Sequence, residues 1–403
     1  MHVLFADAID RSAVDSLAGL GHEVTYEPSL TADELANHLT GVDVLVVRST
    51  KVPETALRAS QQLALVVRAG AGTENIDVAA ASSQGVHVCN VPGRNAVAVA
   101  ELTIGLLLAV DRHIAAGTAD LRAGVWNKKR YSEANGLMGC TLGIIGLGEI
   151  GLAVAERAKA FGLTVVGQRK AERTAKTESR IRSIGIRLVD TLEDLVAASD
   201  IVSLHVPGGA STFGLVDAEL LAHLRDGGIL LNTSRGDCID EAALIRAMDT
   251  RDIRAGLDVF RDEPAAGDTT VESPLAAHAS VVGTHHIGAS TNQAQLAVAA
   301  GIVETVDGFA AGSPVNCINL APRGTGSCNL TIRHYDRVGV LAAVFGVLRG
   351  GGLNVQHMEN QVFAGGQAAV ASIDVSDGFD HELKSQLEAL PDVLGVGYAF
   401  GET

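Results

Sequence analysis

A glycine-rich turn between an apolar strand and a helix constrains the fold of this chain more than any other feature. The stretch LGIIGLGEIG gives Gly146, Gly148 and Gly151 the GxGxxG spacing, directly before the helical pattern EIGLAVAERAKAFG. The first glycine permits a tight turn, the second lets a pyrophosphate approach the backbone, and the third lets helix and strand pack closely. The helix start then offers free amides and a favourable dipole to phosphates. The stretch therefore predicts a dinucleotide-binding unit, with a purely structural glycine turn as the alternative.

Short apolar runs alternate with helical patterns along most of the chain. Residues 1–90 hold one such series, and a second extends from about residue 141 to 288. This alternation is typical of open, mostly parallel sheets with helices on both faces. Two such sheets predict an α/β protein with two Rossmann- or flavodoxin-like lobes and a ligand cleft between them.

The pattern changes near residue 328, where the order becomes strand, helix, strand, strand, helix, strand. That order is ferredoxin-like, and the preceding stretch APRGTGS (321–327) has the composition of a hinge. We therefore expect three domains. They are a discontinuous substrate-binding domain (1–92 and 286–320), a dinucleotide-binding domain (93–285) and a C-terminal domain (326–403).

Composition excludes several classes of protein. The chain has 31 basic and 47 acidic residues and a net charge of −16, which argues against nucleic-acid binding. A few local arginines can still bind a small anion. The longest apolar stretch, 96–110, is interrupted by Glu101 and is too short to span a bilayer, so we expect a buried helix and no membrane partner.

Cysteine usage and the first residues indicate a cytoplasmic protein. The five cysteines are odd in number and lack CxxC spacing, so we expect neither a disulfide framework nor a metal site. The opening MHVLFADAID does not have the pattern of a signal peptide.

Three polar residues follow predicted strands of the second series. Arg235 stands in NTSRGD, Glu263 in DVFRDEP and His286 in THHIGAS. A guanidinium can clamp a carboxylate at two points, and a histidine can carry the proton of an alcohol–ketone conversion. A carboxylate behind the histidine would fix its tautomer. Each of these residues taken singly is more often an ordinary solvated or ion-paired side chain.

These motifs together resemble the D-isomer-specific 2-hydroxyacid dehydrogenases over residues 1–320. The resemblance rests on LGIIGLGEIG, SLHVP, LLNTSRGD, AGLDVFRDEP and HHIGASTNQAQ. Within the family, VVRST, RAGAGTENID, NAVAVAELTIG and GVWNK look most like the phosphoglycerate dehydrogenases that carry a C-terminal ACT domain.

The resemblance implies roles for individual residues. Arg235 would orient the substrate, Glu263 would support His286, and His286 would be the acid/base. The family has a proline where this chain has His285. The residues implied in cofactor binding are Gly146, Gly148, Glu149, Ile150, Gly151, Arg169, Thr233 and Asp258. Those implied in substrate binding are Arg48, Ser49, Ala71, Gly72, Asn95 and Lys128, with a surface cation as the alternative for Arg48 and Lys128.

The C-terminal domain resembles an ACT domain, a module that commonly binds an amino acid between paired copies. His334, Asp336 and Asn354 match effector positions of serine-sensing members. Asp336 replaces a usual asparagine and Val338 a usual proline, which puts serine binding in question because an anion replaces an amide donor. The alternative is a module that only joins copies into a homodimer or homotetramer.

The residue after the second predicted strand of the dinucleotide unit bears on the choice of cofactor. NAD-binding members usually have a carboxylate there, about twenty residues past the glycine turn. This chain has Arg169, followed by Lys170 and Arg173. A guanidinium suits the 2′-phosphate of NADP, so NADP is favoured, although NAD binding beside a solvated cation remains the alternative.

The resemblance thus implies an NAD(P)-dependent oxidoreductase that oxidises D-3-phosphoglycerate to 3-phosphohydroxypyruvate, the first step of serine biosynthesis. One alternative is an NADPH-dependent glyoxylate or hydroxypyruvate reductase. Another is a non-enzymatic regulator that senses dinucleotides.

Overall fold

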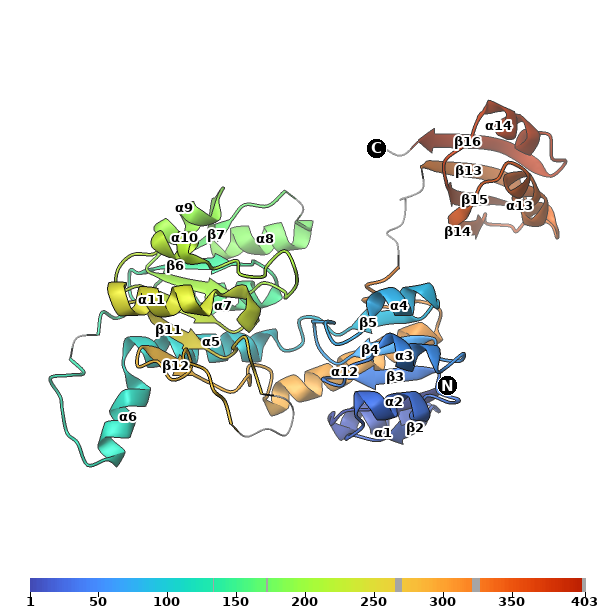
Figure 1. Ribbon diagram of the computed structural model, residues 1–403. Coiled ribbons are helices and arrows are strands. Elements are labelled where there is room, and N and C mark those ends of the chain that lie inside the picture. Colours follow the sequence, from blue (N-terminus) through green and yellow to red (C-terminus); the bar gives the residue numbers. More distant parts are fainter. Residues whose placement is uncertain (133, 172, 265–269, 321–326, 401–403) are drawn as a thin grey trace. The chain divides into compact units, whose positions relative to one another are not determined.

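The structure is a computed structural model that describes residues 1–132, 134–171, 173–264, 270–320 and 327–400. It divides into two compact units, Met1–Asn319 and Leu320–Thr403 (Figure 1). The predicted hinge at 321–327 lies, apart from Ser327, outside the described residues, as does the predicted domain boundary at residue 326.

The first lobe of the larger unit is built on a parallel five-stranded sheet with the order β2-β1-β3-β4-β5. Its inner strands β1, β3 and β4 are apolar runs that are mostly buried on both faces, as parallel sheets require, whereas the edge strand β2 has no buried residue. The order is that of flavodoxin-like folds. The elements are β1 (His2–Phe5), α1 (Arg11–Gly19), β2 (Glu23–Tyr26), α2 (Ala32–His38), β3 (Val44–Val47), α3 (Glu54–Arg58), β4 (Leu65–Arg68), α4 (Val78–Ser83) and β5 (His87–Asn90).

The second lobe holds a parallel seven-stranded sheet with the order β12-β11-β10-β9-β6-β7-β8. The order reverses between β6 and β9, where α/β sheets of this kind bind their ligands. The glycine turn joins β6 to α7 at this point. The elements are β6 (Thr141–Ile145), α7 (Glu149–Ala160), β7 (Thr164–Gln168), α8 (Ala175–Ile184), β8 (Arg187–Val189), α9 (Leu192–Ala197), β9 (Ile201–Leu204), α10 (Ala218–Ala222), β10 (Ile229–Asn232), a 3-10 turn (Gly236–Cys238), α11 (Glu241–Arg251), β11 (Arg254–Leu257) and β12 (Val281–Gly283).

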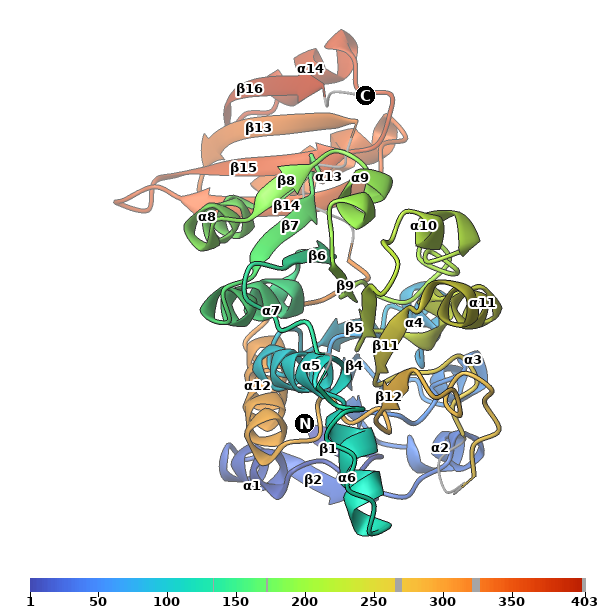
Figure 2. The ribbon, with the colours of Figure 1, turned by 90° about the vertical axis from the view of Figure 1, so that its left-hand side faces the viewer.

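The chain crosses between the lobes twice. It leaves β5 for α5 (Ala96–Asp111), which packs on α7 and on the strands of the second sheet, and α6 (Ile114–Arg122) follows. It returns through α12 (Asn292–Ala310), which lies along α1 beside the first sheet (Figure 2). The apolar stretch 96–110 is thus a buried helix, as predicted, and none of the helices described is long and apolar enough to cross a membrane.

The smaller unit is an antiparallel sheet of order β14-β15-β13-β16 with two helices packed against each other. Its elements are β13 (Cys328–Tyr335), α13 (Val340–Gly350), β14 (Val355–Val362), β15 (Ala368–Val375), α14 (His381–Glu388) and β16 (Val393–Phe400). Alternate residues of β13 are buried in its own core, as expected for a sheet covered on one face. The predicted fold class is therefore confirmed for both units.

Candidate functional site

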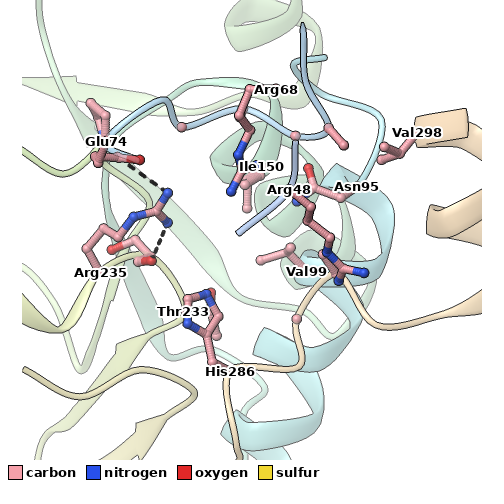
Figure 3. A pocket seen from close by; sticks show the side chains of 18 of the residues that line it. Arg48, Arg68, Glu74, Asn95, Val99, Ile150, Thr233, Arg235, His286 and Val298 are labelled. Carbon is pink, nitrogen blue, oxygen red and sulfur yellow. Dashed lines mark hydrogen bonds and ion pairs between the residues drawn. The ribbon is translucent and has the colours of Figure 1, made fainter. Parts of the chain in front are cut away.

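A cleft of about 600 Å³ opens between the two lobes of the larger unit (Figure 3). It is lined by the carboxyl ends of strands from both sheets and by the segment that leads into α12. Among the predicted site residues, those that line it are Arg48, Ser49, Ala71, Gly72, Asn95, Ile150, Thr233, Arg235, Asp258 and His286. Sequence positions up to 238 residues apart therefore meet in one cavity.

His286 and Glu263 form a hydrogen-bonded pair at the edge of this cleft. His286 Nδ1 lies 2.7 Å from Glu263 Oε2, and the amide of Phe260 donates to the other oxygen of Glu263 at 3.2 Å. Burial acts to raise the pKa of Glu263, but the hydrogen bond and the charge of His286 outweigh it and hold that pKa below its ordinary value. An ionised Glu263 assigns the proton to Nδ1 and leaves Nε2 free to exchange a proton with a ligand.

The loop that carries His286 is held in an unusual conformation by Asp258. His286 has a φ of 52°, which for a residue with a side chain is a strained, left-handed conformation. Asp258 is buried, and its carboxylate accepts from Thr284 Oγ1 at 2.6 Å and from the amides of Ile287 and Gly288, both at 2.8 Å. Asp258 therefore positions the His286 loop, a role that the sequence did not reveal.

Arg235, which lies shortly after β10, also lines the cleft and is paired with Glu74. Its Nη2 is 3.4 Å from Glu74 Oε1, and its Nη1 donates to the carbonyl of Ser234 at 2.8 Å. A Cβ at Gly72 would overlap both side chains, so the glycine leaves room for the pair. Burial acts to raise the pKa of Glu74, yet its backbone hydrogen bond and the charge of Arg235 hold that pKa below its ordinary value. Glu74 is thus an anion beside Arg235.

Arg68 is a cleft residue that the sequence analysis missed. It ends β4, and its guanidinium points into the cavity toward Arg235 (Figure 3). Burial and then the charge of Arg235 lower its pKa, and its Nε has no hydrogen-bond partner among the described residues. Asn95 Oδ1 is similarly buried and unpartnered. Buried polar atoms are normally satisfied, so these two mark where a polar ligand would sit.

Arg48 is held by Gln295 in the first turn of α12. With the amide turned so that both groups are satisfied, Gln295 Oε1 accepts from Arg48 Nη1 at 3.0 Å and from Nη2 at 3.3 Å. Both residues line the cleft. The amides of Arg48 and Ser49 donate to Asp7 at 2.6 and 3.1 Å, which fixes the loop that follows β3.

Lys128 is the predicted substrate residue that the structure does not bring to the cleft. It lies in the exposed segment that follows α6, a helix without a buried residue. α6 packs on α5, and no residue of the described segment after it lines the cavity. Lys128 therefore stays a prediction without support from the described residues.

The glycine turn has the space that a pyrophosphate needs. A Cβ at Gly151 would overlap the carbonyl oxygen of Gly146, while a Cβ at Gly148, which caps α7, would meet nothing within 4 Å. Ile150 and Thr233, which directly follows β10, line the cleft. The residues present therefore fit a dinucleotide.

The charge of Glu149 beside this turn is neutralised by an arginine. Glu149 occupies the first turn of α7, where an anion would repel a pyrophosphate. Arg180 of α8 donates to Glu149 Oε2 at 2.7 Å and to Glu156 Oε1 at 2.9 Å. The hydrogen bonds that Arg180 donates to these carboxylates, the one to Glu156 first, raise the pKa of Arg180.

Arg169 follows β7 and faces a carboxylate from the neighbouring strand. Its Nε donates to Asp190 Oδ1 at 3.0 Å, and both side chains are mostly exposed. Asp190 directly follows β8 and stands 21 residues after Arg169, so the sequence around Arg169 did not reveal it. Arg173 instead turns back and donates to the carbonyl of Gln168. Arg169 is therefore an exposed cation at this strand end, beside the exposed Lys170, and Asp190 would compete with a phosphate for it.

Within one chain the predicted effector residue Asn354 lies at the end of the sheet away from His334 and Asp336. His334 is buried, with Nδ1 2.8 Å from the carbonyl oxygen of Tyr335 and Nε2 3.0 Å from Asn360 Oδ1. Asp336 follows the carboxyl end of β13 and Asn354 precedes the amino end of β14. Both strands pair antiparallel with β15 and so run parallel to each other, which puts these two residues at opposite ends of the sheet.

Comparisons with known proteins agree with this geometry. Residues 104–288 match the family description "D-isomer specific 2-hydroxyacid dehydrogenase, NAD binding domain". A D-3-phosphoglycerate dehydrogenase of Methanocaldococcus jannaschii is 40% identical over 75% of this chain and 56% of its own length. A hydroxypyruvate reductase of Thermotoga maritima is 43% identical over 74% of this chain and 95% of its own.

A solved structure adds a relative with a bound cofactor. The NADPH-dependent glyoxylate/hydroxypyruvate reductase of Sinorhizobium meliloti, in complex with NADP and malonate, has a TM-score of 0.65 and 29% identity over 79% of this chain and 96% of that chain. The chain spans little more than half the length of the phosphoglycerate dehydrogenases it matches, 56% and 59% in two archaeal cases.

Proposed function

Because the chain belongs to the D-isomer-specific 2-hydroxyacid dehydrogenases, we propose that it oxidises D-3-phosphoglycerate to 3-phosphohydroxypyruvate with NAD(P), the first step of serine biosynthesis. One observation carries the choice of substrate. Three guanidiniums, of Arg48, Arg68 and Arg235, meet in one cleft, where Glu74 offsets one of them. Such a cleft suits a ligand with two anionic groups, a carboxylate at Arg235 and a phosphate near Arg48 and Arg68.

The residues of the cleft divide the chemistry between them. Arg235 binds the carboxylate and holds the hydroxyl-bearing carbon beside the His286 loop. His286 Nε2 takes the hydroxyl proton while Nδ1 donates to Glu263, whose ionised carboxylate stabilises the imidazolium that forms. A nicotinamide cofactor held at the glycine turn would supply the hydride acceptor for this oxidation. Asp258 fixes the His286 loop so that Nε2 and the substrate hydroxyl stay in reach.

Initial rates with a panel of 2-hydroxy acids test the proposal. D-3-Phosphoglycerate, D-glycerate, glycolate and D-lactate, and the matching 2-oxo acids in the reverse direction, would each be assayed with both cofactors. We expect the highest kcat/KM for the phosphorylated pair. A higher kcat/KM for glycolate or D-glycerate would contradict the choice of substrate.

A reductase of glyoxylate or hydroxypyruvate is the second candidate. It is favoured by the similarity to the Thermotoga maritima and Sinorhizobium meliloti enzymes, because this chain matches nearly the whole length of both. In the same assay this function would appear as fast reduction of both unphosphorylated 2-oxo acids with NADPH. A regulator without turnover is disfavoured, because the His286–Glu263 pair is intact.

Gln295 offers a test of the phosphate end of the cleft. In Gln295→Leu the Arg48 guanidinium loses its bidentate acceptor, so KM for D-3-phosphoglycerate should rise about three- to tenfold. KM for D-glycerate, which lacks the phosphate, should change less than about twofold. Gln293→Leu on the exposed face of the same helix is the matched control. An equal rise for both substrates would mean that Gln295 supports the cleft as a whole.

We further propose that NADP is the preferred cofactor, bound through its 2′-phosphate by Arg169. The exposed guanidinium at the end of β7 supports this choice, and Asp190 weakens it. Arg169→Asp should lower kcat/KM for NADP about ten- to a hundredfold, mainly through KM, because a charge-assisted contact is lost and repulsion is added.

Two further variants sharpen this test. Asp190→Asn releases Arg169 and should lower KM for NADP without changing KM for NAD. Arg246→Asp changes the net charge equally but lies on α11, beside the other end of the sheet, and should alter neither. If the wild-type enzyme prefers NAD and Arg169→Asp does not alter that preference, the proposal is contradicted and Arg169 is an ordinary surface cation.

We also propose that the smaller unit is an ACT-like domain that joins copies of the chain and binds an amino acid between them. Its strand order supports this, and the separation of Asp336 from Asn354 means that a site using both needs two copies. A chain ending at Asn319 should sediment as a smaller assembly than the full chain while keeping activity. An unchanged assembly would contradict the role in joining copies of the chain. A reaction rate that does not respond to millimolar serine would contradict the role in amino-acid binding.

The organisation and location of the activity are part of the same proposal. The two crossings between lobes, before α5 and before α12, support a substrate-binding domain at 1–92 and 286–320 and a dinucleotide-binding domain at 93–285. The five cysteines are free thiols, which fits the reducing cytoplasm.

A further inference from the structure

Cys89 and Cys317 lie directly opposite each other across a short antiparallel pairing outside the cleft. Cys89 belongs to β5, and Cys317 to the segment that follows α12. The amide of Asn90 donates to the carbonyl of Asn316 at 3.2 Å, and the amide of Ile318 donates to the carbonyl of Val88 at 2.9 Å. These bonds flank the two cysteines instead of joining them, so they form a non-hydrogen-bonded pair.

The register of this pair has the reach of a disulfide. In non-hydrogen-bonded antiparallel pairs the Cα atoms are about 4.5 Å apart and the side chains share one face of the ladder. Disulfides need Cα atoms separated by about 4.4 to 6.8 Å. The backbone would therefore close the bond with little displacement.

Side-chain contacts hold the two strands in this register. Asn319 Oδ1 accepts from the amide of Val88 at 2.8 Å, and its Nδ2 donates to the carbonyl of Val86 at 2.9 Å. The Cys317 thiol lies 3.3 Å from the same Oδ1. The segment ending at Asn319 is thus fastened along β5, just before the smaller unit begins at Leu320.

The two thiols differ in accessibility. Cys89 is fully buried in the core of the first lobe, and burial together with the neighbouring Cys317 raises its pKa to about 12. Cys317 packs on the same core but is only partly buried. An external reagent would therefore reach Cys317 first, and Cys89 would be the thiol that completes the reaction.

We propose that Cys89 and Cys317 are a two-thiol oxidation site that closes to an intramolecular disulfide with a small disulfide of the glutathione class as oxidant. The Cys317 thiolate attacks one sulfur of the oxidant, forming a mixed disulfide and releasing one thiolate. Cys89 then gives up its proton, and its thiolate attacks Cys317 Sγ and displaces the second thiolate of the oxidant, which takes up a proton. Two protein thiols are oxidised and one small disulfide is reduced to two thiols, so atoms and electrons balance.

The disulfide would stabilise the first lobe without touching the chemistry. Both cysteines belong to the same lobe and neither lines the cleft. The bond would cross-link positions far apart in the sequence and restrict the unfolded chain. We expect the midpoint of thermal unfolding to rise by about 5 °C and kcat/KM to stay the same.

The test uses the reduced full-length chain and oxidised glutathione at pH 8. After free thiols are alkylated, intact mass should show two fewer alkylated cysteines and no retained glutathione. Peptide mapping should recover one cross-linked peptide joining Cys89 to Cys317, and dithiothreitol should reverse it together with the gain in thermal stability.

Variants decide whether the pair itself is responsible. Cys317→Ser should abolish the cross-link, and Cys89→Ala should leave glutathione trapped on Cys317. Cys140→Ser, at a partly buried cysteine of the other lobe, should leave the cross-link intact. If Cys89→Ala does not fold, Cys317→Ser carries the test alone. A stable glutathione adduct on wild-type Cys317, a different cross-link, or no reaction with excess oxidant would overturn the proposal.

Discussion

Replacing His286 with asparagine should abolish turnover while leaving cofactor binding nearly intact. The amide of asparagine can still donate to Glu263 Oε2 in the place of Nδ1, but it offers no basic nitrogen at the position of Nε2. Loss of a general base typically costs about a hundred- to ten-thousandfold in kcat. The glycine turn, which would hold the cofactor, belongs to β6 and α7 and is untouched. Steady-state kinetics and cofactor titration of the same sample would measure both effects.

His285→Asn is the matched control, since the two histidines are adjacent. His285 is exposed and does not line the cleft. It replaces the proline that the family has there, so its substitution should affect only the flexibility of the loop and cost less than about threefold in kcat. An active His286→Asn beside an inactive His285→Asn would reverse the assignment of the acid/base.

The fold could be predicted because its signals are local. Apolar runs such as 44–47, followed by helical patterns, specify a parallel α/β sheet wherever they occur, and the glycine turn marks the strand at which the order reverses. The predicted family is confirmed by the comparisons. The order of strands across each sheet is not written in any short stretch, because it depends on which apolar faces pack together.

The site residues that were missed depend on contacts between distant segments. Glu74 meets Arg235 only when the two lobes face each other, and Gln295 meets Arg48 only because α12 returns to pack beside the first sheet. Asp190 reaches Arg169 from the neighbouring strand of the sheet. Arg68 was within reach of the sequence, because it is a cation at the carboxyl end of an apolar strand, where α/β sheets bind ligands.

Asp258 illustrates a different limit. The sequence assigned it to the cofactor, and it does line the cleft. Its carboxylate, however, accepts three hydrogen bonds from the loop at 284–288 and holds His286 at a positive φ. A motif identifies such a residue without saying which neighbour its oxygens bind.

Arg235→Gln should produce the second large effect, and Glu74 determines its size. The variant loses two charge-assisted hydrogen bonds to the substrate carboxylate, which costs about a hundred- to ten-thousandfold in kcat/KM. The variant also exposes the substrate to Glu74. The pKa of Glu74 lies below its ordinary value, so Glu74 is an anion near neutral pH. Loss of the guanidinium therefore adds repulsion to the loss of attraction.

The double variant Arg235→Gln with Glu74→Gln separates the two contributions. Removing the anion as well should restore about tenfold of the lost kcat/KM, a positive coupling that a double-mutant cycle measures. Glu74→Gln alone should lower KM slightly, because Arg235 then has no competing partner beside the substrate carboxylate. Arg235→Lys keeps the charge but loses the planar two-point geometry, and should fall between wild type and Arg235→Gln. Two results would contradict this role: a kcat/KM of Arg235→Gln within threefold of wild type, or a kcat/KM of the double variant below the product of the two single effects. In either case Arg235 is not the carboxylate-binding residue, and its pairing with Glu74 serves only the structure of the loop.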